Sequence, residues 1–294
     1  MKAAFAVTNL SGSRNSNVFA TNPRALIVTI EGLLSSLSPA NRAIADVLLK
    51  LQRADPSMVR MAHIAEAAQV SEAAVVKFAQ QLGLSGFREL RSIFLRYQEM
   101  EAVEEYEELS VEDGSEALIR KIFNTSIRSL KDTLAVFDFA AFEQAAEALA
   151  QARQRVILGL GGSAPLAREF EHRLLDVGLT SQAYDEPQLL TRAVALVNAR
   201  DVVVAISHSG STEAILDAAK TARDRGATTI GLTNMRGSAL TSICSYSLIS
   251  AARGSEVVGV KTMSKVAHLN ILYGLAVRAA HYALTTADDV NAPD

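Results

Sequence analysis

Serine and threonine side chains crowd the segment SHSGST, residues 207–212, which directly follows the apolar run VVVAI. Four of its six residues carry hydroxyls, and helix-forming residues resume at Glu213. A helix start leaves backbone N–H groups unpaired and carries about half a positive charge, and hydroxyls supply further donors. Such a segment can bind a phosphate without an arginine. We therefore predict that this hydroxyl loop (residues 207–212) binds an anion; an ordinary capped turn is the alternative.

A second segment, GLGGSA (residues 159–164, the glycine loop), also places small residues and a hydroxyl between an apolar run and a helical pattern. Gly159, Gly161 and Ala164 would equally fit the G-x-G-x-x-G/A pattern of dinucleotide-binding proteins, with Asp185 as the ribose-binding acid. The dinucleotide alternative assigns no function to the hydroxyl loop, so we favour phosphate binding.

Apolar, β-branched runs alternate with helical patterns in the second half of the chain, in the segments 154–178, 179–187, 199–226, 227–238 and 245–251. Such alternation predicts an α/β fold in which helices cover both faces of a parallel sheet. Ligands of such sheets bind at the carboxyl ends of the strands. Both loops follow expected strands, so we expect them at that edge.

The charge and composition of the chain exclude several classes of protein. The 294 residues carry a net charge of −3, are 49% hydrophobic and include one cysteine, Cys244. This charge argues against a broadly basic surface, and one cysteine excludes an intrachain disulfide framework, so we expect Cys244 to be a small core residue. No segment suits a signal peptide or a membrane span, so we expect a cytoplasmic protein. The histidines show no metal-ligand spacing, and no cofactor is implied.

An acidic stretch divides the chain. Residues 99–116 contain nine carboxylates and no basic residue, a composition typical of an extended or solvated linker. The expected organisation is a mostly disordered tail at 1–28, a helical domain at 29–98, the linker at 99–116, an α/β domain at 117–287 and a second tail at 288–294.

The helical domain contains two short helices separated by a tight turn, the spacing of a helix-turn-helix. Ser38 and Pro39 mark the start of its first helix, and Ser71 is placed to cap the third. The outer face of the third helix and the basic residues after it would contact DNA through Ser71, Ala73, Ala74, Lys77, Gln81, Arg88 and Arg91. Residues 31–98 hold eight basic and six acidic side chains, only a weakly basic balance, so a plain three-helix packing module is the alternative.

Five stretches, in family order between about residues 31 and 285, resemble the RpiR family of bacterial transcriptional regulators. They are LSPANRAIADVLL, VSEAAVVKFAQQLGLSGFREL, GLGGSAPLAREFEHRLL, DVVVAISHSGSTEAILDAAKTARDRGATTIGLTN and VKTMSKVAHLNILYGLAV. The resemblance implies a helix-turn-helix followed by a sugar-isomerase (SIS) domain with a five-stranded, flavodoxin-like parallel sheet. It also implies operator DNA and a phosphosugar effector as partners, and a homodimer or homotetramer through the SIS domain. The last helical segment, residues 264–284, is apolar nearly all round, as expected of a helix partly buried against a partner subunit.

By motif position, the resemblance places the sugar phosphate on Ser163, Ser207, Ser209 and Thr212. The full set of expected effector-site residues is Gly161, Gly162, Ser163, Ser207, His208, Ser209, Gly210, Ser211, Thr212, Glu256 and Lys265. The stretches VVKFAQQLG and GLGGSA are most similar to members that sense N-acetylmuramic acid 6-phosphate, which favours an amino-sugar phosphate.

Four residues depart from the family pattern. Gln69 stands where the turn of the helix-turn-helix often carries glycine, and a left-handed backbone there would cost glutamine on the order of 1 kcal/mol. Ala74 and Lys77 stand where threonine and arginine are common, which bears on the operator sequence. Lys265 stands where many members have arginine, which bears on the effector contacts.

SIS domains also occur in phosphosugar isomerases and lyases, so catalysis is the alternative function. Isomerisation needs a base close to the acidic proton of the sugar, usually glutamate or histidine. The candidates are His208, Glu171, Glu213 and Glu256. No acid–base pair with diagnostic spacing is present, and an appended DNA-binding domain suits a sensor, so we expect a regulator that is no enzyme.

Overall fold

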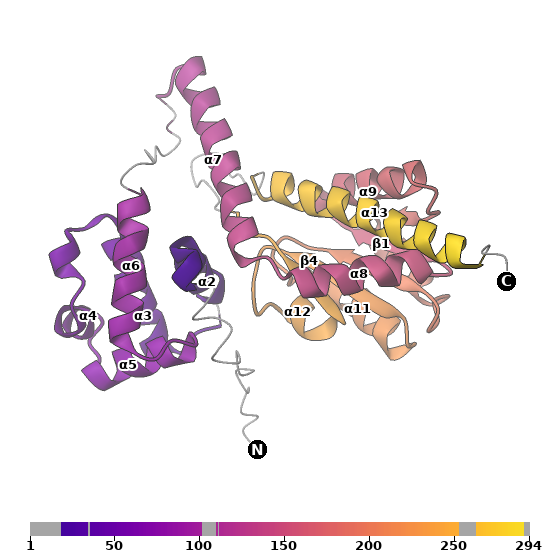
Figure 1. The fold of residues 1–294 in the computed structure, drawn as a ribbon. Helices are drawn as coiled ribbons and strands as arrows, with labels where there is room; N and C mark the ends of the chain where they lie inside the picture. Colours follow the sequence, from indigo (N-terminus) through magenta and orange to yellow (C-terminus); the bar gives the residue numbers. More distant parts are fainter. Residues whose placement is uncertain (1–18, 35, 102–109, 111, 253–262, 291–294) are drawn as a thin grey trace. The chain divides into compact units, whose positions relative to one another are not determined.

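The computed structural model describes residues 19–34, 36–101, 110, 112–252 and 263–290. The chain forms two compact units, Met1–Glu107 and Glu108–Asp294, and Figure 1 shows the elements of each. Within the described ranges, no helix has the length and apolar character needed to cross a membrane. Nor do three or more His, Cys, Asp or Glu side chains gather there as a metal site.

The first unit is helical throughout its described part. Its elements are α2 (Pro23–Leu33), α3 (Pro39–Lys50), the 3-10 turns η1 (Leu51–Arg53) and η2 (Pro56–Met58), α4 (Met61–Ala67), α5 (Glu72–Gln81) and α6 (Phe87–Glu101). The Ser38 hydroxyl caps α3 by accepting from the Asn41 N–H at 3.4 Å, and Ser71 caps α5 through the Ala74 N–H at 3.3 Å. Both predicted helix starts are therefore confirmed.

The helix α2 corrects the predicted tail. It begins at Pro23, and its side chains from Ala25 to Ile30 are buried, so the tail cannot extend to residue 28. The apolar run ALIVTI has no polar face that would give it an amphipathic period. Burial on all sides of the helix explains why the sequence pattern did not mark it as part of the domain.

The turn between α4 and α5 contains a strained residue. Gln69 has a φ of 53° and is the one non-glycine residue with positive φ in the described part of the chain. The N–H groups of Gln69 and Val70 donate to the carbonyls of Glu66 and Ala65, at 3.1 and 2.9 Å, and these bonds close the end of α4. The left-handed backbone anticipated at this position is confirmed.

We expect Gln69→Gly to raise the free energy of unfolding of the first unit by about 0.5–1 kcal/mol. Glycine adopts the left-handed backbone without the Cβ clash, and this gain exceeds the added entropy of its unfolded state. The matched control is Gln80→Gly, which places glycine in the right-handed helix α5 and should cost up to about 1 kcal/mol. Urea unfolding followed by circular dichroism measures both, and a Gln69→Gly protein less stable than the wild type would contradict the assignment of strain.

The second unit carries the sheet. Its elements are α7 (Ser115–Val136), α8 (Phe139–Gln151), β1 (Arg155–Gly159), η3 (Gly161–Ser163), α9 (Ala164–Asp176), β2 (Gln182–Tyr184), α10 (Pro187–Val194), β3 (Val202–Ile206), α11 (Glu213–Asp224), β4 (Thr228–Thr233), α12 (Ala239–Ile243), β5 (Tyr246–Ile249) and α13 (Met263–Val290). The five strands are parallel, in the order β2-β1-β3-β4-β5. This is the flavodoxin-like order, and the predicted fold class is confirmed.

Helices cover both faces of this sheet (Figure 1). On one face, residues of α8, α9 and α13 pack against strand residues such as Ile157 and Val204. On the other face, residues of α10, α11 and α12 pack against strand residues such as Val156 and Val203. Every residue of β1 and β3 is buried, which explains why their sequences, apart from Arg155 at the start of β1, are apolar runs without alternation.

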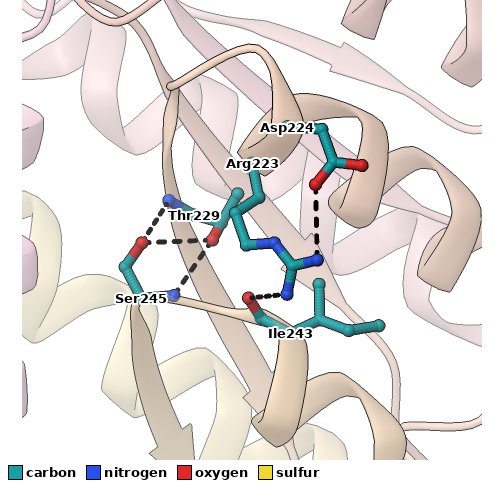
Figure 2. A network of polar contacts seen from close by, with 5 residues as sticks. All are labelled: Arg223, Asp224, Thr229, Ile243 and Ser245. Carbon is teal, nitrogen blue, oxygen red and sulfur yellow. Dashed lines mark hydrogen bonds and ion pairs between the residues drawn. The ribbon is translucent and has the colours of Figure 1, made fainter.

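Polar contacts tie the amino end of β4 to its neighbours (Figure 2). The Ser245 N–H donates to Thr229 Oγ1 at 3.0 Å, and the Thr229 N–H donates to Ser245 Oγ at 3.3 Å. The Arg223 guanidinium on α11 donates to the Ile243 carbonyl at 3.5 Å. Burial raises the pKa of Cys244, which lies between these contacts, to about 12, so its thiol stays protonated at neutral pH.

Candidate functional site

A cavity of about 220 Å³ opens where β1 and β3 end. The glycine loop and the hydroxyl loop line it together, and α13 supplies a further wall. The lining residues are Leu160, Gly162, Ser163, Leu166, Ile206, Ser207, His208, Ser209, Thr212, Ile215, Lys265 and His268. Two loops that are more than 40 residues apart in the chain thus meet at one site, because β1 and β3 are adjacent parallel strands.

The hydroxyl loop is held in place by β4. Thr233 Oγ1 and the Asn234 N–H both donate to the His208 carbonyl oxygen, each at 3.0 Å. The Ser207 N–H donates to the Leu232 carbonyl at 3.0 Å, which continues the sheet pairing by one residue. The loop backbone is therefore fixed by the sheet, and its side chains can be oriented before a ligand arrives.

Two hydroxyls at the cavity do not serve as helix caps. Thr212 is the N-cap of α11 and Ser163 is the N-cap of α9, yet neither side chain makes a cap hydrogen bond, in contrast to Ser71. Thr212 Oγ1 instead lies 3.0 Å from Ser207 Oγ. An ordinary capped turn, the alternative for the hydroxyl loop, does not describe this geometry.

Gly210 allows the hydroxyl loop to pack closely against the start of α12. Its φ is +59°, and a Cβ at this position would clash with the Ser238 hydroxyl and lie 2.9 Å from Thr233 Oγ1. Gly210 belongs to the expected effector-site residues but does not line the cavity. In the structure it lets the loop approach the start of α12 instead, and the Leu240 N–H donates to the Gly210 carbonyl at 3.0 Å.

Not every predicted effector residue reaches the cavity. Gly161 and Ser211 are exposed and do not line it, although the Ser211 hydroxyl donates to Ser209 Oγ at 2.9 Å. Glu256 lies outside the described residues. The predicted residues that do line the cavity are Gly162, Ser163, Ser207, His208, Ser209, Thr212 and Lys265.

The helix α13 contributes two basic side chains, one turn apart. A Cβ built on Gly162 would lie 3.5 Å from Lys265 Nζ, so the ammonium group reaches the glycine loop. His268 is 1% exposed, and its ring lies 6.4 Å from that of His208, centroid to centroid. Burial, helped by the charge of His208, lowers the pKa of His268 to about 3, so its ring is neutral at physiological pH.

Our sequence reasoning missed His268. In a helix that is apolar nearly all round, a single histidine reads as a core residue, and hydrophobic periodicity does not tell which side of such a helix faces a cavity. The available signal was its position three residues after Lys265, since residues at that spacing lie on one helix face.

Two of the three acidic candidates for catalysis, Glu171 and Glu213, do not line the cavity. Glu171 Oε1 accepts from the Ala183 N–H at 3.0 Å, and Glu213 is exposed in the first turn of α11. Asp185, the ribose-binding acid of the dinucleotide alternative, instead accepts from Arg168 Nε and Nη2, at 3.0 and 2.7 Å. No carboxylate from the described part of the chain lines the cavity. The cavity offers hydroxyls, an ammonium group and imidazoles, which suit a small anion that carries hydroxyls.

In the first unit, α5 exposes most of the residues predicted to contact DNA. Ser71, Ala73, Lys77 and Gln81 are exposed, Ala74 is partly buried, and Arg88 is exposed at the start of α6.

Two of these predicted residues already have partners within the unit. Gln81 Oε1 accepts from Asn41 Nδ2 at 2.6 Å, and Arg91 Nε donates to the Val59 carbonyl at 2.7 Å. Lys77 and Arg88 are therefore the cations of this set that protrude most freely.

The chain matches known proteins in both units. The helix-turn-helix domain of the rpiR family matches residues 25–99, and the SIS domain matches residues 148–278. The HTH-type transcriptional regulator HexR of Pseudomonas aeruginosa is 31% identical over 208 residues, which cover 71% of this chain and 73% of HexR. The chain belongs to the RpiR family.

This RpiR-family member is a transcriptional regulator with an SIS domain, and its helix-turn-helix implies DNA binding. The RpiR regulator of Escherichia coli K12 is 29% identical over 225 residues, 76% of each chain. The structure of the Vibrio vulnificus NanR protein complexed with ManNAc-6P has the same fold. Its TM-score is 0.53 at 22% identity, and the match covers 90% of this chain and 97% of NanR.

Proposed function

We propose that this regulator binds a phosphorylated sugar in the SIS cavity and that occupancy changes its affinity for operator DNA. The observation that carries the proposal is the set of hydroxyls around the cavity, two of them at helix starts that they do not cap. A phosphate accepts hydrogen bonds only, so hydroxyls and backbone N–H groups at helix starts are suitable partners. The Lys265 ammonium offsets part of the phosphate charge.

The size of the cavity supports a single sugar as the ligand. Its 220 Å³ falls below the roughly 300–1,000 Å³ typical of sites for drug-sized ligands, which favours a single sugar phosphate over a dinucleotide. NanR, which shares the fold, is described with ManNAc-6P bound, which supports a phosphosugar for the present chain. We favour a hexose or hexosamine phosphate and, on the resemblance of the stretches VVKFAQQLG and GLGGSA, N-acetylmuramic acid 6-phosphate.

A phosphosugar isomerase is the second candidate, and the cavity does not favour it. Enolisation of a sugar needs a base whose pKa is near the working pH. No carboxylate from the described residues lines the cavity, and His268, with a pKa of about 3, is a weak base at neutral pH. The relatives that match over most of the chain are named as regulators. We therefore infer a cytoplasmic sensor without turnover.

On the DNA side, we infer that α5 enters the major groove. Its exposed face carries small and hydrogen-bonding residues, which suit close approach to base edges. We assign base-edge contacts to Ser71, Ala73, Ala74 and Gln81, and phosphate contacts to Lys77, Arg88 and Arg91.

We also infer that the regulator is a homodimer or homotetramer assembled through the SIS unit. The apolar residues of α7 at positions 119, 123, 127 and 134 are between 49% and 65% exposed, whereas Asp132 on the same helix is fully buried. On α13, Val277 and Leu284 are 51% and 64% exposed. Apolar side chains exposed in rows of this kind favour contact with another subunit.

The proposed function is tested by a gel shift on an operator selected from random duplexes. We expect at least one member of a panel of hexose and N-acetylhexosamine 6-phosphates to change the operator Kd fivefold or more and to raise the melting temperature. The same sugars without phosphate should do neither. Lys77→Ala should weaken operator binding and reduce its salt slope by about 1, with the ligand-induced melting shift retained.

Light scattering on the same samples reports the oligomeric state. Conversion of a panel sugar by the protein would support the isomerase. If no member of the panel changed the operator Kd or the melting temperature, the sensor function would be contradicted.

A further inference from the structure

One residue that lines the cavity carries a buried nitrogen with no hydrogen-bond partner in the described part of the chain. His268 lines the cavity and is 1% exposed, and its Nε2 atom lacks a partner among the residues that the structure describes. A buried polar atom without a partner is costly, and native proteins nearly always supply one. Because the His268 side chain lines the cavity, a molecule bound there would lie beside this ring and could supply the missing partner.

The hydrogen bonding of the ring decides what kind of partner that is. The Thr233 backbone hydrogen-bonds the imidazole in a way that favours protonation, as a carbonyl acceptor does. Since Nε2 has no partner among the described residues, we assign this bond to Nδ1. A carbonyl oxygen only accepts, so Nδ1 carries the proton and Nε2 is left with its lone pair.

An unprotonated Nε2 is a poor neighbour for a phosphate oxygen, because both atoms only accept hydrogen bonds. It attracts an O–H or N–H group instead. The donors that suit a phosphate are the side chains of Ser163, Ser207, Ser209 and Lys265. The cavity therefore combines groups that suit a phosphate with one atom that suits the sugar.

We propose that His268 reads the sugar part of the effector, with Nε2 accepting a hydrogen bond from a sugar hydroxyl or amide N–H while the phosphate lies at the hydroxyl loop. This inference rests on the proposed function of the cavity and adds a residue that determines specificity. A site built to accept a hydrogen bond from its ligand rejects an analogue that lacks the donor, because the acceptor is then left unpaired.

Calorimetric titration of the full chain tests the proposal with three probes: inorganic phosphate, glucose 6-phosphate and N-acetylglucosamine 6-phosphate. His268→Phe keeps a flat ring without an acceptor, and His268→Leu is a second variant without one. We expect both to bind the better sugar phosphate at least tenfold more weakly than the wild type, and inorganic phosphate within twofold of it. His268→Gln, which retains an amide oxygen, should recover most of the lost affinity.

The outcomes distinguish a failure of the inference on His268 from a failure of the proposed function on which it rests. If the folded Phe and Leu variants bind the sugar phosphate like the wild type, or lose phosphate and sugar phosphate affinity equally, His268 does not read the sugar. If the wild-type protein binds inorganic phosphate but neither sugar phosphate better, the inference on His268 is also overturned. A wild-type protein that binds none of the three probes overturns the inference, and the proposed function falls with it only if the whole sugar-phosphate panel also fails to bind.

Discussion

Ser209→Asp should abolish the response to a sugar phosphate, lowering its affinity by about 100-fold or more. Ser209 lines the cavity, so the new carboxylate would face the phosphate at short range. Two like charges about 5 Å apart repel by roughly 3 kcal/mol at the effective dielectric of a protein surface, and a factor of 100 in Kd needs about 2.7 kcal/mol. Calorimetry with the best sugar phosphate of the panel measures the loss.

Two controls locate this effect in the cavity. Ser209→Ala removes one hydroxyl without adding charge and should weaken binding by about tenfold, the scale of one hydrogen bond to a charged group. Ser211→Ala, at the exposed neighbour that does not line the cavity, should change affinity by about twofold or less.

Operator affinity without effector should be unchanged in all three variants, because the helix-turn-helix lies in the other unit. A Ser209→Asp protein that still responds to the sugar phosphate would show that the phosphate binds elsewhere.

Gly210→Ala should lower the free energy of unfolding of the SIS unit by about 3 kcal/mol. Forcing a Cβ into the left-handed region costs about 1–2 kcal/mol, and overpacking against Ser238 and Thr233 costs about 1–3 kcal/mol more. For a unit of this size, the expected fall in melting temperature is roughly 6–12 °C. Urea unfolding followed by circular dichroism measures the loss.

Gly161→Ala is the matched control. Gly161 also has a positive φ, of 52°, but no atom lies within 4 Å of a Cβ built there. This variant should therefore lose only the backbone contribution, about 1–2 kcal/mol. If the two variants were equally destabilised, the close approach of the hydroxyl loop to α12 would not matter for stability.

Local patterns predicted the sheet well. β1 and β3 are buried on both sides, so their apolar runs are uninterrupted and their turns are marked by glycine and serine. The helix caps Ser38 and Ser71 were predictable for a similar reason, since a cap depends on a residue and the backbone three positions later.

The boundary of the first unit and the interaction partners of single side chains were less predictable. α2 was assigned to a disordered tail because its sequence has no polar face, and only its burial within the first unit shows that it is part of the core. Asp185 fitted a dinucleotide pattern until its ion pair with Arg168, 17 residues earlier in the chain, was seen. In both cases the deciding contact is made by residues that local periodicity does not relate.

The sequence by itself determined the order of strands and helices, the two loops rich in glycine and hydroxyls, and the membership of the chain in its family. These follow from residue types at short spacing, where the backbone geometry is nearly the same in every protein. Only the tertiary structure decided that α13 turns Lys265 and His268 towards the cavity and that Gly210 faces α12. The rotation of a helix that is apolar nearly all round is set by packing against elements distant in the chain, which a local pattern does not contain.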